Sequence, residues 1–389
     1  SVDQLRPQVK TAIEKSIRGK VELGKLSLRL IPNIALKIDG VKVYAPAPFD
    51  KEPLSVTEKV ELRMPLMSLL LAPSGTFIVS NTQLKIVANE KTNALTEALP
   101  APTVEELKAI QVEARKAKPL EETLKGLPSF LGSRISAARF DFALENLNVE
   151  MLPPKPSKTD HTRIKNFKLK VSDIGIESKM ELDGTGEVDV VAAGATVSGP
   201  MKLAGTLSYR PVGRDHEVTM ALENKLDALD IAMKPLFHKS AGVPFGASMA
   251  GVVKVGVENT QADLSKLAFR FANVEFQGKL KATVDAVDTT KGEFAANFAA
   301  DNFDLNAWGS LIPLVRDYKL GGKVGLKILS SGPLKDPSLD MAINLSGVTG
   351  ATPALQKPIS DLNGQIRVAG TAANPRLTVN PFTMKIGSG

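Results

Sequence analysis

The sequence predicts a mainly β protein with an elongated sheet, an amphipathic helix at its N-terminal end and a helical insert near 102–131. From residue 134 onward, apolar and polar residues alternate in nearly every segment, as in strands with one apolar and one polar face. Few segments have a helical period. The pattern G-x-x-x-[DN]-P-x-L starts at Gly332 and again at Gly370. Repeated hairpins of this kind indicate a sheet that grows by addition.

The N-terminal 18 residues are expected to form a helix. Leu5, Val9, Ile13 and Ile17 recur at four-residue spacing and make one apolar stripe. Proline is tolerated only in the first turns, so the helix is expected to begin near Leu5, and Gly19 is expected to cap its end.

From residue 21 the period changes to two. Apolar residues alternate with polar ones until Gly40 interrupts the phase, and the alternation then resumes through 54–63 and 75–88. The apolar run at 64–72 is expected to form a buried helical turn, with contact to a membrane as the alternative.

The helical insert is predicted to contain two helices. Thr103 and Glu106 have the spacing of a capping box, and Pro119 is expected to end the first helix. A second helix is expected over about 120–131, and both would cover one end of a sheet. The predicted regions are therefore a membrane-proximal helix at 1–18, an N-terminal β region with the insert at 19–133, and a repetitive β region at 134–389.

Composition argues against catalysis and against a metal or other cofactor. The 389 residues include no Cys and three His, so thiol chemistry and Cys-based metal sites are excluded. His216 lies between Asp215 and Glu217, but adjacent strand residues point to opposite faces, which disfavours a shared metal site. No nucleophile elbow, P-loop or dinucleotide-binding motif is present. We expect a non-enzymatic protein with no cofactor.

Positive charge is concentrated near the N-terminus. The chain has 49 Lys and Arg against 42 Asp and Glu, and residues 1–42 alone hold nine basic and four acidic residues. A basic end would suit an anionic bilayer surface, and the alternative is an ordinary solvated face. A second basic stretch, 155–170, has the same two interpretations. Aromatic residues are 5% and do not interleave with the basic ones, so nucleic acid is not an expected partner. The membrane-proximal basic residues are expected to be Arg6, Lys10, Lys15, Arg18 and Lys20.

Three segments resemble the AsmA family of bacterial envelope proteins. The first is RGKVELGKLSLRLIPNIALKIDGVKVYAPAPF, whose Leu26, Leu28, Leu30 and Pro32 match an L-x-L-x-L-x-P element. The second, LRMPLMSLLLAPSGTFIVSNTQLKIVANEKTNALTEAL, contains the turn Lys91-Thr92-Asn93, and the third is ISDLNGQIRVAG.

The resemblance implies a fold and a location. Like TamB and the chorein-type lipid-transfer proteins, the chain would form a long, curled antiparallel sheet, an open β-trough with an apolar inner face. It would be periplasmic and tethered to the inner membrane through a segment preceding Ser1. No 18-residue apolar run that could span a bilayer occurs in the sequence itself.

The predicted helices are too few to cover the apolar strand positions. The sheet must therefore either pack on itself as a sandwich or enclose something apolar, and acyl chains suit the second option. We expect a protein that conducts or shelters phospholipid, or another acyl lipid, between the inner membrane and the outer envelope. The alternative is a scaffold or assembly factor for outer-membrane proteins or a larger envelope complex, acting by strand pairing at sheet edges. Plain core packing is the alternative role for each expected groove residue: Ile34, Leu36, Ile38, Phe167, Leu169, Val171, Phe269, Phe271, Phe294 and Phe298.

Overall fold

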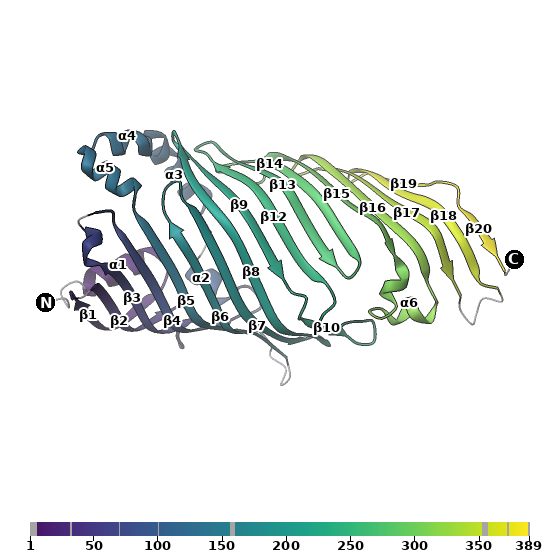
Figure 1. Cartoon of the computed structure of the whole chain (residues 1–389), viewed down its shortest axis with the longest axis horizontal. Coiled ribbons are helices and arrows are strands. Elements are labelled where there is room, and N and C mark those ends of the chain that lie inside the picture. Colours follow the sequence, from purple (N-terminus) through teal and green to yellow (C-terminus); the bar gives the residue numbers. More distant parts are fainter. Residues whose placement is uncertain are drawn as a thin grey trace. The chain divides into compact units, whose positions relative to one another are not determined.

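The computed structural model describes residues 6–31, 33–69, 71–99, 101–155, 160–351, 357–371 and 373–387. It is mainly β, with 61% strand and 15% helix, and its 20 strands belong to one open, mixed sheet (Figure 1). The fold class predicted from the sequence is thus confirmed. The chain divides into two compact units: unit 1 is 1–106 with 118–213, and unit 2 is 107–117 with 214–389.

Unit 1 contains eight long strands that pair in chain order. Each strand is antiparallel to the next except at one place, where β4 and β5 are parallel. This pair departs from the antiparallel expectation because the helical insert lies between the two strands, and a parallel pair needs such a crossover connection. The strands are β1 (Lys20–Arg29), β2 (Asn33–Tyr44), β3 (Ser55–Pro65), β4 (Ser74–Val87), β5 (Arg139–Leu152), β6 (His161–Ile174), β7 (Lys179–Ala192) and β8 (Ala195–Val212).

The helices agree with the sequence in part. The capping box is confirmed, since the Thr103 amide donates to Glu106 Oε2 (2.7 Å) and the Glu106 amide donates to Thr103 Oγ1 (3.2 Å). The single helix predicted over 120–131 is wrong: Pro128 lies between two shorter helices and cannot continue the first. The helices are α1 (Arg6–Ser16), α2 (Ala94–Ala98), α3 (Val104–Lys116), α4 (Leu120–Lys125) and α5 (Ser129–Ser136).

Two smaller expectations near the N-terminus are also wrong. Gly19 does not cap α1, which ends at Ser16; it lies where β1 begins, and a Cβ there would be 2.0 Å from the Tyr44 carbonyl oxygen. The run 64–72 contains the expected helical turn, the 3-10 helix η2 (Leu66–Leu69), but Leu66, Met67 and Leu71 are exposed, so the expected burial is wrong for these side chains. Pro32 lies outside the described residues.

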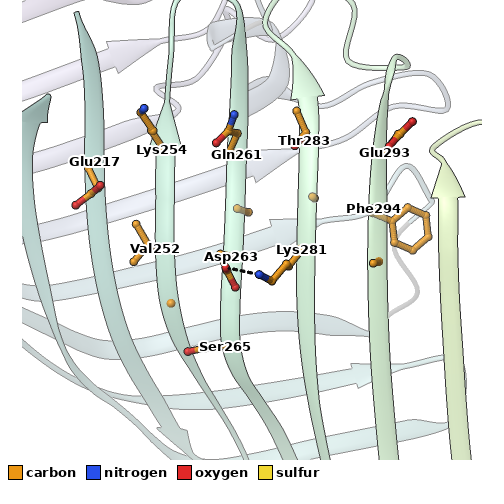
Figure 2. Close-up of a pocket in the computed structure, with 14 residues that line it drawn as sticks. Glu217, Val252, Lys254, Gln261, Asp263, Ser265, Lys281, Thr283, Glu293 and Phe294 are labelled. Atoms are coloured by element: carbon orange, nitrogen blue, oxygen red, sulfur yellow. Dashed lines mark ion pairs between the residues drawn. The ribbon is translucent and has the colours of Figure 1, made fainter. Parts of the chain in front are cut away.

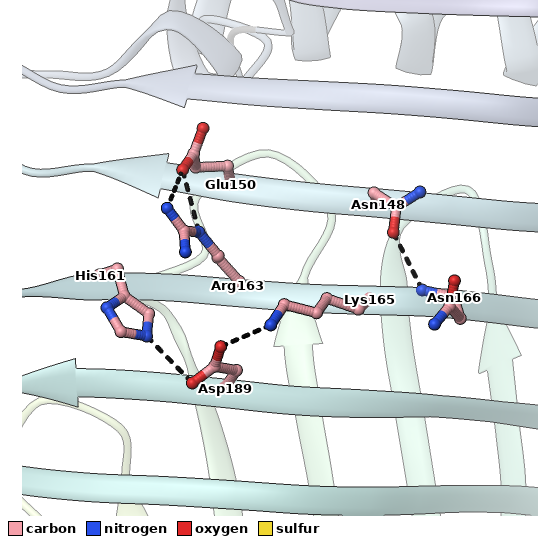
Figure 3. Close-up of polar contacts among 7 residues, drawn as sticks. All are labelled: Asn148, Glu150, His161, Arg163, Lys165, Asn166 and Asp189. Carbon is pink, nitrogen blue, oxygen red and sulfur yellow. Dashed lines mark hydrogen bonds and ion pairs between the residues drawn. The ribbon is translucent and has the colours of Figure 1, made fainter.

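Residues with a left-handed backbone recur on four strands of unit 1. Gly40, Asn81, Asn146 and Asn166 all have positive φ, between 52° and 79°, on four different strands. Asn146 Nδ2 donates to Asn81 Oδ1 (3.0 Å), and the Asn166 amide donates to Asn148 Oδ1 (3.0 Å; Figure 3). Beside Asn146 and Asn166 the register of β5 with β6 shifts, as at a β-bulge. At Gly40 and Asn81 the registers with the neighbouring strands do not shift.

Unit 2 consists of hairpins added one after another. Strands β12 to β18 pair in chain order, β9 pairs with β12, and β18 pairs with both β19 and β20. Gly332 and Gly370 of the sequence repeat have φ of 116° and 123° and end their strands at hairpin turns. The strands are β9 (Asp215–Lys225), β10 (Asp230–Met233), β11 (Phe237–Lys239), β12 (Phe245–Val255), β13 (Asn259–Phe271), β14 (Val274–Asp285), β15 (Gly292–Asp304), β16 (Gly321–Pro333), β17 (Ser338–Gly350), β18 (Ile359–Thr371), β19 (Pro375–Val379) and β20 (Thr383–Ile386), with the helices η3 (Leu305–Trp308) and α6 (Pro313–Asp317).

Fully buried apolar side chains gather near the N-terminus. One cluster lies beneath α1 and contains Val21, Leu26, Ile38 and Val41. Another contains Ala94 and Ala98 of α2 together with Ala45, Leu54 and Ile86. Among the described residues after Ala98, the buried apolar side chains are Leu229, Ala232, Val274, Ala300, Leu311 and Val315. Most strands therefore contribute no fully buried apolar core.

Candidate apolar binding face

In unit 1, apolar side chains line up from strand to strand. Residues directly opposite each other in a sheet lie on the same face. One row of such partners crosses eight strands: Leu26, Ile38, Val60, Val79, Leu144, Leu169, Gly184 and Leu203. The adjacent row is Leu28, Leu36, Leu62, Phe77, Phe142, Val171, Leu182 and Gly205. We call these two rows the apolar face of unit 1.

Burial differs along this face. Leu26 and Ile38 are 4% and 7% exposed because α1 covers them. From Val60 onward the members of the first row are only partly buried, apart from Gly184, and Phe77 of the second row is 39% exposed. The first row is therefore covered at its β1–β2 end and more accessible beyond it, whereas Leu28, at the β1 end of the second row, is 43% exposed.

Unit 2 has a longer row of the same kind. It crosses nine strands, and every member is apolar or glycine: Leu222, Met249, Leu267, Gly278, Phe298, Ile328, Met341, Val368 and Leu377. We call the surface that carries this row the apolar face of unit 2. At about 4.8 Å between strands, eight intervals span about 38 Å. One leaflet of a bilayer core is roughly 15 Å thick, so the row is about two and a half times the length of one acyl chain.

The apolar positions of unit 2 are partly covered rather than buried. Along β15, Phe294, Ala296 and Phe298 are of intermediate exposure, whereas the intervening Ala295 and Asn297 are exposed. A sandwich core would exclude water from the first set, as interiors are close-packed. The contrast shows an apolar face that the rest of the described chain does not seal.

Phenylalanine rings lie over glycines on this surface. A Cβ added at Gly278 would be 2.3 Å from a ring carbon of Phe298, and one at Gly364 would be 2.3 Å from a ring carbon of Phe382. In unit 1, Phe167 covers Gly186 in the same way, at 2.9 Å. Because glycine has no side chain, each ring can lie close to the sheet instead of standing away from it.

Aromatic residues gather at one end of the apolar face of unit 2. Phe271 packs against Trp308 (ring centroids 5.4 Å apart), Phe245 (5.7 Å) and Phe237 (5.8 Å). The indole N–H of Trp308 donates to Asn273 Oδ1 at 2.9 Å. The sequence contains no other Trp, and the residue serves here as a packing anchor.

Four of the expected groove residues belong to the two rows of unit 1, and Phe298 belongs to the row of unit 2. Leu36 and Val171 share one row of unit 1, and Ile38 and Leu169 share the other. The other expected groove residues are Ile34 on β2, Phe167 on β6, Phe269 and Phe271 on β13, and Phe294 and Phe298 on β15. Phe269 faces Phe276 of β14 and is exposed, and Phe294 faces Ala282.

Sequence reasoning missed many members of the rows. Their own segments carry the same alternation, which was a usable signal, but only pairing registers show which residues meet. The missed residues include Val60, Val79, Leu62, Phe77, Phe142 and Gly278.

The N-terminal basic residues make contacts within unit 1. Arg6 Nη2 donates to the Gly24 carbonyl oxygen (2.7 Å), and Lys10 lies 3.7 Å from Glu14. The other contacts are Arg18 with Glu106 (3.6 Å) and Lys20 with Glu22 (2.7 Å), and Lys15 lies in the last turn of α1.

The second basic stretch is also paired with acids. Arg163 contacts Glu150 (2.9 Å), and Lys165 contacts Asp189 (2.6 Å) on the polar face of β5–β7 (Figure 3). Hydrogen bonds from Lys165 and His161 lower the pKa of Asp189 to about 2. Lys155 pairs with Glu90 at 3.0 Å, so these contacts agree with a solvated polar face.

A hollow of about 700 Å³ with a mainly apolar lining lies over β9 and β12–β15 in unit 2 (Figure 2). Asp263 and Lys281 form an ion pair of 2.9 Å within it, and Glu217, Lys254 and Glu293 also line it. In the described ranges, no three His, Asp or Glu residues come together as metal ligands. The hollow therefore combines apolar side chains with charges of both signs.

Comparisons with known proteins add no family. No protein-family model matches the chain, and no curated protein matches its sequence. Within the part of the chain that the structure describes, no helix has both the length and the apolar character needed to cross a membrane. Interpretation therefore depends on the two apolar faces themselves.

Proposed function

We propose that this chain is a non-enzymatic protein that shelters or conducts lipid acyl chains on its apolar sheet faces. The observation that carries the proposal is the nine-strand row from Leu222 to Leu377, which is apolar throughout and only partly covered. Each buried CH₂ contributes about 0.8 kcal/mol, so an acyl chain gains by leaving water for such a surface.

Because the nine-strand row is apolar along its whole length, it favours movement of a bound acyl chain over tight binding at one position. When an acyl chain slides by one strand, it leaves one apolar contact and makes a similar one, so gains and losses nearly cancel. The rings of Phe298 and Phe382 lie close to their glycines, which keeps the surface low in relief. No nucleophile or metal is needed for such transfer.

The cargo and location that we propose follow from the AsmA resemblance and from chemistry. Phospholipid is the proposed cargo, with its acyl chains on the apolar face and its head group in solvent. We place the protein in the periplasm, tethered to the inner membrane through an N-terminal segment, with transfer toward the outer envelope.

The first test measures bound lipid. The purified chain should carry phospholipid that native mass spectrometry detects, and a photo-crosslinker at Phe298 should label it. The matched control places the same crosslinker at Asn297, which is next in sequence but lies on the polar face. Protein free of lipid, or equal labelling at both positions, would overturn the proposal.

A second candidate function is strand pairing with an envelope protein. Strands β19 and β20 are exposed along their whole lengths, and Leu377 and Ile386 are 68% and 64% exposed. Exposed edges of this kind are templates for strand addition. This scaffold function would survive a charge placed at Ile328 but not proline substitutions in β19.

A further inference from the structure

Helix α1 lies on the apolar face of unit 1 without belonging to its core. Val9, Ile13 and Ile17 pack against the cluster beneath the helix, yet no α1 residue is itself buried. The helix thus hides Leu26 and Ile38 through one apolar stripe.

Two polar side chains fasten α1 to the backbone of β1. Glu14 Oε1 accepts a hydrogen bond from the Val21 amide (3.1 Å), and Arg6 Nη2 donates to the Gly24 carbonyl oxygen (2.7 Å). Each such bond has a modest net strength because water replaces it when it breaks. A surface that competes for the same side chains can therefore displace α1 from β1.

The same helix has the composition of an interfacial helix. Arg6, Lys10 and Lys15 outnumber its single acid, Glu14, and Arg18 and Lys20 follow directly. Basic amphipathic helices bind anionic bilayers by inserting their apolar side, and each cation near the surface adds to the attraction. The stripe of Val9, Ile13 and Ile17 cannot contact the sheet and a bilayer at once.

We propose that α1 leaves β1–β2 and binds an anionic lipid surface instead, which uncovers Leu26 and Ile38. Docking on a membrane and opening of the apolar face would then be one event. This inference rests on the proposed lipid function, and it names an anionic bilayer as the partner that opens the face.

Hydrogen exchange on the full chain tests the exchange of partners. Phosphatidylglycerol vesicles should raise the exchange rate of the Val21 amide, which loses Glu14 as its acceptor, while amides of α1 stay protected. Phosphatidylcholine vesicles should change neither. Unchanged exchange at β1 in the presence of bound anionic vesicles would overturn the inference. Lipid detected by native mass spectrometry would meanwhile leave the proposed function standing.

Two variants that each remove one negative charge can distinguish release of α1 from a general electrostatic effect on vesicle binding. Glu14→Ala removes the bond to Val21 and should raise affinity for phosphatidylglycerol vesicles roughly three- to tenfold, as expected from the loss of one hydrogen bond that holds the closed state. Glu22→Ala removes an acid that pairs with Lys20 and Tyr44, not with α1, and should raise it much less. Equal effects of the two substitutions would show that charge alone acts and would overturn the inference.

Discussion

The ring of Phe298 lies against Gly278 on the neighbouring strand, so that a Cβ at position 278 would be 2.3 Å from ring carbon Cδ1. It would also be 2.6 Å from the Asn297 carbonyl oxygen. Gly278→Ala should therefore push the ring away from the sheet and reduce the stability of unit 2 by about 1–3 kcal/mol. Urea unfolding and the amount of co-purified lipid measure the two effects.

The double variant Gly278→Ala/Phe298→Leu is the control for this prediction. A smaller side chain leaves room for the new methyl group, so lipid content should recover more than stability does, because the backbone contact remains. If Gly278→Ala changes neither property, the ring does not depend on glycine.

Ile328 and Lys327 offer a matched pair for testing the apolar face. Ile328 belongs to the nine-strand row, whereas Lys327 is exposed on the other face of β16. Ile328→Asp should abolish lipid binding, since a carboxylate placed against acyl chains loses its hydration. Lys327→Asp should leave bound lipid unchanged in native mass spectrometry. Similar lipid content in the two variants would favour the scaffold function.

Glu61 should make the stability of unit 1 sensitive to acid. Its carboxylate is 8% exposed and contacts Arg63 Nε (2.7 Å) and Lys59 Nζ (3.4 Å). Hydrogen bonding to Arg63, the largest cause, lowers the pKa of Glu61 from 4.5 to about 2. Because the folded pKa is lowered, the stabilisation is complete above pH 4.5 and is lost as the pH falls toward 2.

Glu61→Gln should remove this dependence. We expect a loss of roughly 2 kcal/mol at pH 7, below the full linkage value because Arg63 is half exposed, and almost none at pH 2. Thermal unfolding followed from pH 7 to pH 2 measures the difference. Glu121→Gln, in an exposed position on α4, is the control, and an equal effect there would contradict the assignment.

Trp308 should report acyl chains on the apolar face of unit 2. It packs on Phe271, which lies at the end of that face, and no other tryptophan interferes. Phospholipids brominated on their acyl chains should quench its fluorescence when they bind. In the variant Trp308→Phe/Asn297→Trp, which moves the indole to the polar face, quenching should be weak. Quenching of equal size in both proteins would show that lipid does not prefer the apolar face.

Local patterns in the sequence predicted local structure well. The alternation along β2, β6 and β15 and the capping box of Thr103 and Glu106 depend only on neighbours in the chain. The errors at 64–72 and 120–131 came from treating apolar residues as buried and from passing over Pro128. Burial depends on what packs above a residue, which the alternation does not contain.

The sequence predicted individual residues of the candidate site, but not which of them lie side by side on one surface. Phe167 and Leu169 were expected to face a groove, yet their partners Leu147 and Leu144 on β5 follow from a register that shifts between them. That shift comes from the extra residue on β5 beside Asn146, whose left-handed backbone has no unique signature in the sequence.

The sequence by itself determined that this protein has strands with one apolar and one polar face and few helices to cover them. This follows because side chains alternate with period two in any strand, whatever lies around it. Only the tertiary structure decided which apolar residues form rows, that rings lie over Gly278 and Gly364, and that α1 hides Leu26 and Ile38. These features depend on pairing registers and packing between residues far apart in the chain, and those contacts form only when the sheet assembles.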